Sequence, residues 1–357
     1  MKVVSIVGAR PQFIKAAPVS RVFRKNSIEV LVNTGQHYDD DMSAVFFREL
    51  DIPKPDYNLG VGSGTHGKQT GEMLIKIEEV LIKERPDFVL VFGDTNSTIS
   101  GALAAVKLAI PLAHVEAGLR SYNREMPEEH NRVLTDHCSG LLFCPTKAAA
   151  DCLTREGIHK GVHIVGDVML DAFLHNIETA RAHSNILENL GLDPKGYNLA
   201  TIHRAYNTDN PKRLHNILSA LSHIGQKVIL PIHPRTRKQI AKNQMTGFLS
   251  DKDSNLMIIE PAGYLDMLIL EQNARLILTD SGGVQKEAYF MAVPCITLRP
   301  ETEWIETVNA GWNIIVDDNK DKITEAANHH VWPKDTPDAV FGDGHASERI
   351  VKIVTNT

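Results

Sequence analysis

Carboxylates stand near the ends of neighbouring apolar runs in the first half of this 357-residue chain. Asp94 follows the run 88–92, Glu116 follows 112–115, and Glu128 lies near the start of a helix predicted over 127–138. Because ligands of open α/β sheets bind at the carboxyl ends of strands, we expect these side chains at one sheet edge. Crowded carboxylates raise one another's pKa, which suits general acid–base catalysis. The simpler interpretations are a helix cap for Asp94 and a surface ion pair between Glu128 and Arg132, four residues apart.

A glycine-containing turn follows the first apolar run, 3–7, and leads into a helix predicted over 12–25. The turn reads Gly8-Ala9-Arg10-Pro11. A helix N-terminus presents backbone N–H groups and the positive end of the helix dipole, so it binds phosphate well. We expect Arg10 and Lys15 to point towards a diphosphate or a sugar. A tight turn with solvated charges is the plainer alternative.

A second turn of this kind, Asp280-Ser281-Gly282-Gly283, follows the apolar run 275–278. Its N–H groups and the Ser281 hydroxyl suit a diphosphate. Glu287 lies one turn into the next helix, and a carboxylate there can accept hydrogen bonds from two ribose hydroxyls. The two turns together predict two α/β domains that bind one phosphate-bearing ligand across a cleft.

Two histidines end strands of the second half and are further candidates for binding. His203 follows the predicted strand 197–202, and His233 follows 227–231 with Arg235 two residues later. A lone histidine is more often structural, but the position at a strand end favours function. The sequence 62–67 matches GxGxxG, yet no apolar strand precedes it, so we interpret it as a loop. A nicotinamide-dependent dehydrogenase is therefore disfavoured.

The elements that must position these residues alternate between short apolar runs and helical stretches. That alternation predicts an α/β fold with two Rossmann-like, doubly wound parallel sheets. We expect an N-terminal domain over 1–170 and a C-terminal, nucleotide-binding domain over 171–345. The tail, 346–357, is predicted to be a helix with Ser347 as its N-cap.

The composition excludes several classes of function. A net charge of −6 disfavours a nucleic-acid-binding surface. No apolar run reaches the ~18 residues of a membrane span, and the first residues do not resemble a signal peptide. The four cysteines lack CxxC spacing, so we expect reduced thiols in the cytoplasm and no metal site.

At these motifs the chain resembles the non-hydrolysing UDP-N-acetylglucosamine 2-epimerases over essentially its whole length. The resemblance rests on the segments 8–15, Thr34-Gly35-Gln36-His37, 92–95, 114–120, 127–132, His203-Arg204 and 280–287. It implies the GT-B fold and a C-terminal helix that crosses back to the first domain. It also implies a homodimer whose product is used in polysaccharide biosynthesis.

The resemblance also implies the reaction, which is inversion at C2 of a UDP-N-acetylhexosamine without a cofactor. A proton leaves C2, UDP is expelled to give a 2-acetamidoglucal, and UDP then re-adds. Asp94 and Glu116 would transfer protons, with Glu128 as a third acid–base or orienting group. By the same resemblance, the departing diphosphate would be stabilised by Lys15, Arg10, Arg132 and His203. Phosphate would be bound by Ser281, Gly282 and Gly283, and the ribose by Glu287. Further contacts to the substrate would come from Gln36, His37, Gln69, His233, Arg235 and Arg299.

The chain departs from the family pattern in three places. Trp304 stands where an arginine is usual, which resembles the branch acting on UDP-2,3-diacetamido-glucuronate. Tyr206 replaces a usual acidic residue. Three aspartates at 39–41 follow the Gln-His pair of an activating UDP-GlcNAc site and would repel a diphosphate, so we expect weak or no activation, although Gln69 is kept.

Three other activities remain open at this stage. A GT-B glycosyltransferase would use the same nucleotide site but needs only one catalytic base. A hydrolysing epimerase would release UDP and free ManNAc. A nucleotide-sugar sensor would need no group of strand-end carboxylates.

Overall fold

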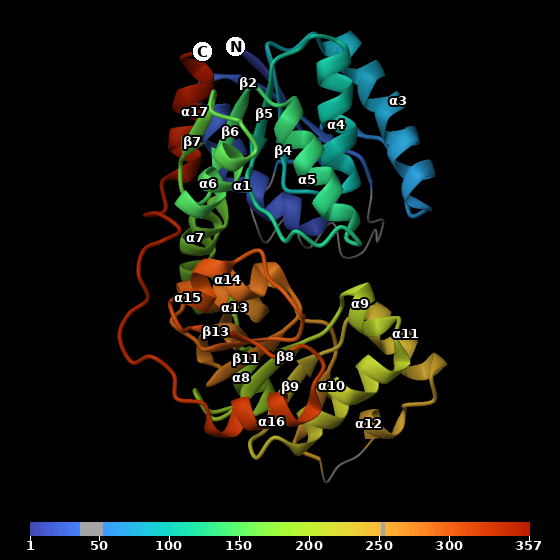
Figure 1. Ribbon diagram of the computed structural model, residues 1–357, viewed down its shortest axis with the longest axis vertical. Helices are drawn as coiled ribbons and strands as arrows, with labels where there is room; N and C mark the ends of the chain where they lie inside the picture. The colour runs from blue at the N-terminus through green and yellow to red at the C-terminus, as the bar shows by residue number, and fades with distance from the viewer. Residues whose placement is uncertain (36–52, 251–253) are drawn as a thin grey trace. The chain divides into compact units, whose positions relative to one another are not determined.

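The computed structural model describes residues 1–35, 53–250 and 254–357 (Figure 1). The chain divides into two compact units, Met1–His175 with Ala339–Thr357, and Asn176–Asp338. In the described residues each unit contains one sheet, and every strand pairing in both sheets is parallel. The alternation of strands and helices in the sequence therefore predicted the sheet type correctly.

The sheet of the first unit has the order β3-β2-β1-β4-β5-β6-β7 among the described residues. Strand order reverses direction between β1 and β4, the place where ligands of such sheets bind. The central strands are continuous apolar runs because helices cover both faces of a parallel sheet. The two-residue β3 was not predicted, since so short a strand has no readable pattern. The strands are β1 (Lys2–Val7), β2 (Ile28–Asn33), β3 (Tyr57–Asn58), β4 (Phe88–Phe92), β5 (Leu112–Val115), β6 (Leu141–Cys144) and β7 (Val162–Ile164).

The helices of the first unit connect these strands and include the C-terminal helix. They are α1 (Arg10–Asn26), α3 (His66–Glu84), α4 (Asn96–Lys107), α5 (Pro127–Cys138), α6 (Lys147–Arg155) and α17 (Ala346–Thr355), while α7 (Val168–His183) continues into the second unit. A helix predicted over 39–50 lies outside the described residues. The helix α17 packs against α1 (Figure 1).

Ser347 was wrongly predicted to cap α17. The N-cap is His345, and the Asp171 carboxylate accepts from the backbone N–H groups of Ala346 (3.1 Å) and Ser347 (2.7 Å). Asp171 comes from α7 and is distant in sequence, so a local pattern could not reveal it.

The sheet of the second unit has the order β10-β9-β8-β11-β12-β13 among the described residues. Its strands are β8 (Asn198–Thr201), β9 (Val228–Pro231), β10 (Leu256–Ile259), β11 (Leu276–Thr279), β12 (Cys295–Thr297) and β13 (Asn313–Ile315). The helices are α8 (Ile186–Leu190), α9 (Ala205–Thr208), α10 (Pro211–His223), α11 (Pro234–Lys242), α12 (Gly247–Ser250), α13 (Tyr264–Asn273), α14 (Gly282–Phe290), α15 (Ile305–Asn309) and α16 (Lys320–His329). The helix that the sequence predicts over 301–309 begins only at Ile305. The Thr302 hydroxyl accepts from the Trp304 backbone N–H and donates to Gln285, and the Glu303 carboxylate accepts from Arg299, so these side chains hold the preceding residues in an irregular turn.

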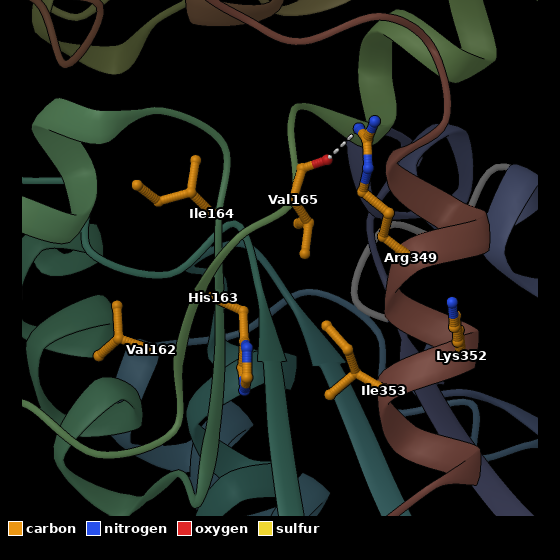
Figure 2. A pocket seen from close by; sticks show the side chains of 7 residues that line it. All are labelled: Val162, His163, Ile164, Val165, Arg349, Lys352 and Ile353. Atoms are coloured by element: carbon orange, nitrogen blue, oxygen red, sulfur yellow. Dashed lines mark hydrogen bonds between the residues drawn. The ribbon is translucent and has the colours of Figure 1, made fainter.

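A hollow of about 550 Å³ lies between β7 and α17 (Figure 2). Ile164 and Ile353 line it, and the Arg349 guanidinium donates to the carbonyl oxygen of Val165 at 3.0 Å. Since β7 is the outer strand and is separated from β5 by β6, this hollow is not at the predicted site. No helix in the described residues is long and apolar enough to cross a membrane.

Candidate active-site residues in the two units

The turn after β1 is tighter than its sequence suggested. A Cβ on Gly8 would lie 2.0 Å from Thr34 Oγ1 and 2.2 Å from Ser97 Oγ, so only glycine fits. The Gln12 side chain accepts from the N–H groups of Gly8 (2.9 Å) and Ala9 (3.1 Å). The N–H groups of Gly8 and Ala9, which precede α1, are therefore engaged within the protein. Contact of Arg10 and Lys15 with a diphosphate or a sugar stays a prediction. Arg10 is exposed at the start of α1.

Lys15 and Glu116 form an ion pair that joins α1 to the end of β5. The Lys15 ammonium contacts Glu116 Oε2, and their side chains are only 11% and 5% exposed. Glu116 follows the last residue of β5 and has a φ of +70°. Few residues other than glycine adopt that conformation, and such strain is found mainly at functional sites. The backbone places the Glu116 carboxylate against the lysine at the carboxyl end of its strand.

Asp94 is held by a second ion pair. Its Oδ2 lies 2.6 Å from Arg132 Nη2, and its backbone carbonyl accepts from Asn131 Nδ2 at 3.0 Å. Arg132 is buried on α5 and also lies 3.2 Å from Glu129 Oε2. Glu128, the second residue of α5, is half-buried.

Gly93 brings the two ion pairs together. A Cβ at this residue would lie 3.1 Å from Lys15 Nζ and 3.4 Å from Glu116 Oε2, and Asp94 is the next residue. The first unit therefore gathers Lys15, Asp94, Glu116 and Arg132 at the ends of β4 and β5. Asp94 and Glu116 follow neighbouring strands as the sequence predicted, whereas their cationic partners were not predicted. Each of the two carboxylates has a cationic partner.

The remaining predicted residues of the first unit concern the activating site. Gln69 is buried on α3; its amide donates to the Gly62 carbonyl at 2.6 Å, and its carbonyl accepts from Asn96 at 2.8 Å. Gln36 and His37, and the aspartates at 39–41, lie outside the described residues. The expectation of weak activation stays a prediction.

In the second unit, the Asp280 carboxylate organises the end of β8. It accepts from the backbone N–H groups of His203 (3.1 Å) and Arg204 (3.0 Å) and from Asn207 Nδ2 (3.1 Å). His203 Nδ1 lies 3.4 Å from Asp280 Oδ1, and the ring is half-buried. Asp280 therefore holds the loop that presents the His203 imidazole.

His233 and Arg235 lie at the start of α11. The His233 ring, whose centroid is 5.7 Å from that of His203, is the N-cap and accepts from the backbone N–H of Arg235 at 3.2 Å. The Arg235 guanidinium pairs with Asp209 and is 43% exposed. The structure thus brings the two histidines together, while Arg235 already has a carboxylate partner.

The start of α14 has the features expected of a phosphate-binding turn. Ser281 is the N-cap, and its Oγ accepts from the Val284 backbone N–H. Gly282 and Gly283 occupy the first two helical positions, where backbone N–H groups have no acceptor within the helix. A Cβ on Gly282 would lie 3.1 Å from Trp304 Nε1, so the glycine permits close approach of the indole.

Glu287 lies one turn further along α14 and is 5% exposed. Its Oε1 accepts from the Tyr264 hydroxyl at 3.0 Å. Glu271, on α13, is completely buried, and its Oε2 has no hydrogen-bond partner in the described residues. Burial, and then the nearby charge of Glu287, raise the pKa of Glu271 well above its ordinary value. Of the two carboxyls, Glu271 is therefore the neutral one.

Arg299 and Trp304 lie beside the same turn. Arg299 is buried and forms a two-pronged ion pair with Glu303, at 3.0 and 2.9 Å. Burial alone would lower the pKa of Arg299, but the Glu303 carboxylate outweighs it and raises the pKa. The Lys286 ammonium lies 4.0 Å from the centroid of the Trp304 ring, a cation–π contact. The charge of Arg299 is therefore already balanced within this unit.

Several residues of this arrangement were given no role from the sequence. Gln12, which closes the first turn, and Glu271, which lies near Glu287, carry no local signal. His114 and Asp136 form a buried pair at 2.7 Å. A polar histidine inside the apolar run 112–115 was the available clue. Among the described residues, no group of three or more His, Cys, Asp or Glu side chains is arranged to hold a metal ion.

Comparison with known proteins places this geometry in context. The family model described as UDP-N-acetylglucosamine 2-epimerase matches residues 22–355. The chain is 49% identical to a UDP-N-acetylglucosamine 2-epimerase of Methanocaldococcus jannaschii, over 99% of each chain. It is 48% identical to a UDP-2,3-diacetamido-2,3-dideoxy-D-glucuronate 2-epimerase of Pseudomonas aeruginosa, also over 99% of each chain.

The structure is similar to a solved one along its whole length. A crystal structure of the Methanocaldococcus jannaschii UDP-GlcNAc 2-epimerase, in complex with UDP-GlcNAc and UDP, has a TM-score of 0.93 and 48% identity, with 100% of both chains covered. This likeness and the two parallel sheets confirm the predicted fold class, two doubly wound domains of the GT-B type.

Proposed function

The chain belongs to the UDP-N-acetylglucosamine 2-epimerase family, and on that premise we propose that it interconverts UDP-GlcNAc and UDP-ManNAc. The observation that carries the proposal is the pairing of Lys15 with Glu116 and of Arg132 with Asp94, both next to Gly93. A carboxylate with a cationic partner is ionised, as a group that accepts a proton from carbon must be. One ionised carboxylate can take the C2 proton from one sugar face, and the other, once it has taken a proton from water, can give that proton to C2 on the opposite face.

The proposed reaction balances without a redox step. A carboxylate takes the C2 proton, the electrons of that C–H bond form the C1–C2 double bond, and the C1–O bond to UDP breaks. UDP leaves with that electron pair, and a 2-acetamidoglucal remains. Re-addition of UDP at C1 and protonation of C2 from the opposite face give the epimer. In this scheme Asp94 and Glu116 transfer protons, and Glu128 orients or assists.

The other predicted residues would bind and stabilise UDP. Negative charge grows on the diphosphate as it departs, so preorganised cations lower the barrier. Arg10, Lys15, Arg132 and His203 would supply that stabilisation. The turn of α14 would bind phosphate and Glu287 the ribose hydroxyls. Further contacts to the substrate are proposed for Gln36, His37, Gln69, His233, Arg235 and Arg299.

Proton NMR in D2O with UDP-GlcNAc tests the proposal. We expect deuterium at C2 together with the signals of UDP-ManNAc, and no acceptor should be needed. Accumulation of UDP and free ManNAc would identify a hydrolysing epimerase instead. Absence of exchange with every UDP-sugar tried would contradict the epimerase and leave a glycosyltransferase or a sensor.

A decorated sugar, UDP-2,3-diacetamido-2,3-dideoxy-glucuronate, is the second candidate substrate. It is supported by the 48% identity to the Pseudomonas aeruginosa enzyme and by Trp304, whose indole lies beside Gly282. The same NMR experiment with this sugar decides between the two. The candidate that shows the larger kcat/KM for C2 exchange is the substrate.

We further propose a homodimer in the cytoplasm that supplies polysaccharide synthesis. All four cysteines belong to the described residues and have free thiols there, which supports a reducing compartment. Light scattering measures the dimer directly. A monomer at micromolar concentration that retains full activity would contradict it.

A further inference from the structure

His114 is a fully buried histidine inside the apolar strand β5. Its Nδ1 lies 2.7 Å from Asp136 Oδ1, and its Nε2 lies 2.7 Å from the carbonyl oxygen of Gly93. A carbonyl oxygen and an ionised carboxylate only accept hydrogen bonds. Both contacts can therefore be hydrogen bonds only if both ring nitrogens carry a hydrogen, which makes the ring an imidazolium cation.

Asp136 is ionised, as this argument requires. It is buried on α5 and accepts from Arg120 Nη1 at 2.7 Å and from the Gly118 backbone N–H at 3.2 Å, in addition to His114. Burial alone would raise the pKa of Asp136, but the hydrogen bonds from His114 and Arg120 and the guanidinium charge of Arg120 lower it. The oxygens of Asp136 thus face donors from three directions.

The charges around His114 balance. Arg120 also forms a two-pronged pair with Glu156, at 2.7 Å for both bonds. The Arg120–Glu156 hydrogen bond lowers the pKa of Glu156, so that carboxylate is ionised too. On the side facing β6, burial raises the pKa of the Cys144 thiol, which stays neutral. His114 and Arg120 are two cations, and Asp136 and Glu156 are two anions, so a charged His114 leaves no net buried charge.

His114 acts on the backbone that carries Asp94. Gly93 has a φ of +62°, its N–H donates to the Val115 carbonyl at 3.0 Å, and its own carbonyl accepts from His114. Both polar groups of Gly93 are thus tied to β5. The space beside Gly93 is occupied by Lys15 Nζ and Glu116 Oε2. A shift of this glycine would move Asp94 relative to Glu116.

We propose that His114 is a positioning residue, whose imidazolium, with a hydrogen bond from each ring nitrogen, fixes the Gly93 carbonyl and thereby the separation of Asp94 from Glu116. His114 does not touch the substrate in this account and takes no part in proton transfer. The consequence for kinetics rests on the proposed C2 chemistry. The charge state does not, so it can be tested on its own.

The charge state is tested by ¹⁵N NMR of the intact protein labelled at histidine. The His114 signals are assigned by their loss in His114→Gln. We expect both ring nitrogens to carry a hydrogen at about pH 7, where an exposed histidine, with a pKa of about 6.5, is mostly neutral. A neutral ring at pH 7 would overturn the proposal, whatever reaction the protein catalyses.

The positioning role is tested by the kinetics of His114→Gln and Asp136→Asn. Displacement of a catalytic group by about 1 Å costs on the order of 10²-fold in rate. We therefore expect kcat and C2 deuterium exchange to fall by about 10²-fold, with KM for the UDP-sugar within about threefold and UDP affinity unchanged. A merely structural role would lower the yield or melting temperature and leave kcat per active molecule unchanged, which would contradict the proposal.

His345→Gln is the matched control. His345 also pairs with a carboxylate, Glu348, at 2.9 Å, but its side chain is 60% exposed. This variant should keep the wild-type kcat. If the wild-type protein shows no C2 exchange, the proposed function fails while the ¹⁵N result still decides the charge of His114. If Asp136→Asn does not fold, the spectrum of the wild-type protein remains decisive for that charge.

Discussion

Two strand-end aspartates, one in each unit, use the same position in a parallel sheet differently. Asp94 follows β4, its side chain is 28% exposed, and Arg132 contacts one of its oxygens. Asp280 follows β11 and is completely buried, and its carboxylate accepts from two successive backbone N–H groups, at 203 and 204, and from Asn207. A carboxylate whose oxygens all accept hydrogen bonds from backbone and amide donors stabilises the local structure. One that is partly exposed with a single cation can exchange a proton.

This difference assigns different work to the two units. The first unit presents carboxylates with cationic partners, which suits proton transfer. The second unit uses its carboxylate to build a loop and presents backbone N–H groups at the start of α14, which suits binding of a diphosphate. This assignment of proton transfer to the first unit and binding to the second can be tested with variants that each remove one charge.

The largest expected effect is that of Asp94→Asn or Glu116→Gln. General acid–base groups contribute about 10²–10⁴-fold to rate, so we expect kcat to fall by that range while KM changes little. The reason is that an amide keeps the shape of the carboxylate but cannot accept the C2 proton. The measurement is the steady-state rate of epimerisation together with C2 deuterium exchange.

Asp151→Asn provides the control for that experiment. Asp151 forms an exposed pair with Lys147 on α6, and surface pairs contribute little. Its kcat should equal that of the wild-type protein. The division of labour would be wrong if Asp280→Asn lowered kcat as much as Asp94→Asn while the protein stayed fully folded.

The sequence predicted the strand ends well and their partners poorly. Asp94, Glu116 and Ser281 were placed correctly after apolar runs because a run of buried residues is a local property. The pairing of Lys15 with Glu116 joins residues 101 positions apart, and that of Arg132 with Asp94 joins residues 38 apart. No local pattern encodes such contacts.

One helix start was predicted wrongly for the same reason. Asp171, and not Ser347, supplies the acceptor at the start of α17. The Gln12 side chain, which was given no role, accepts from the N–H groups of Gly8 and Ala9 just before α1. At α17 the position of the accepting side chain depends on the tertiary fold and not on the local sequence.

A smaller effect, on binding, is expected from Glu287→Gln in the second unit. Hydrogen bonds to charged groups contribute about 1.5–3 kcal/mol, so loss of the charge should raise KM by about 10- to 100-fold. The change in kcat should be small, in contrast to Asp94→Asn. Isothermal titration with UDP checks the result, because the affinity for UDP alone should fall by the same factor. Unchanged UDP affinity would remove Glu287 from the nucleotide site.

The smallest expected effect is a gain in stability from Glu271→Gln in the second unit. Burial, and then the charge of Glu287, raise the pKa of Glu271 above its ordinary value of 4.5, so the folded protein keeps a proton that the unfolded chain loses. The folded state therefore loses stability as the pH rises from about 4.5 towards the folded-state pKa. Glutamine does not titrate, so the melting temperature of the variant should exceed that of the wild-type protein by more at pH 8 than at pH 5. Glu325→Gln, at an exposed position of α16, should show no such trend. A difference that shrinks as the pH rises would mean that Glu271 is ionised in the folded protein, beside the charged carboxylate of Glu287.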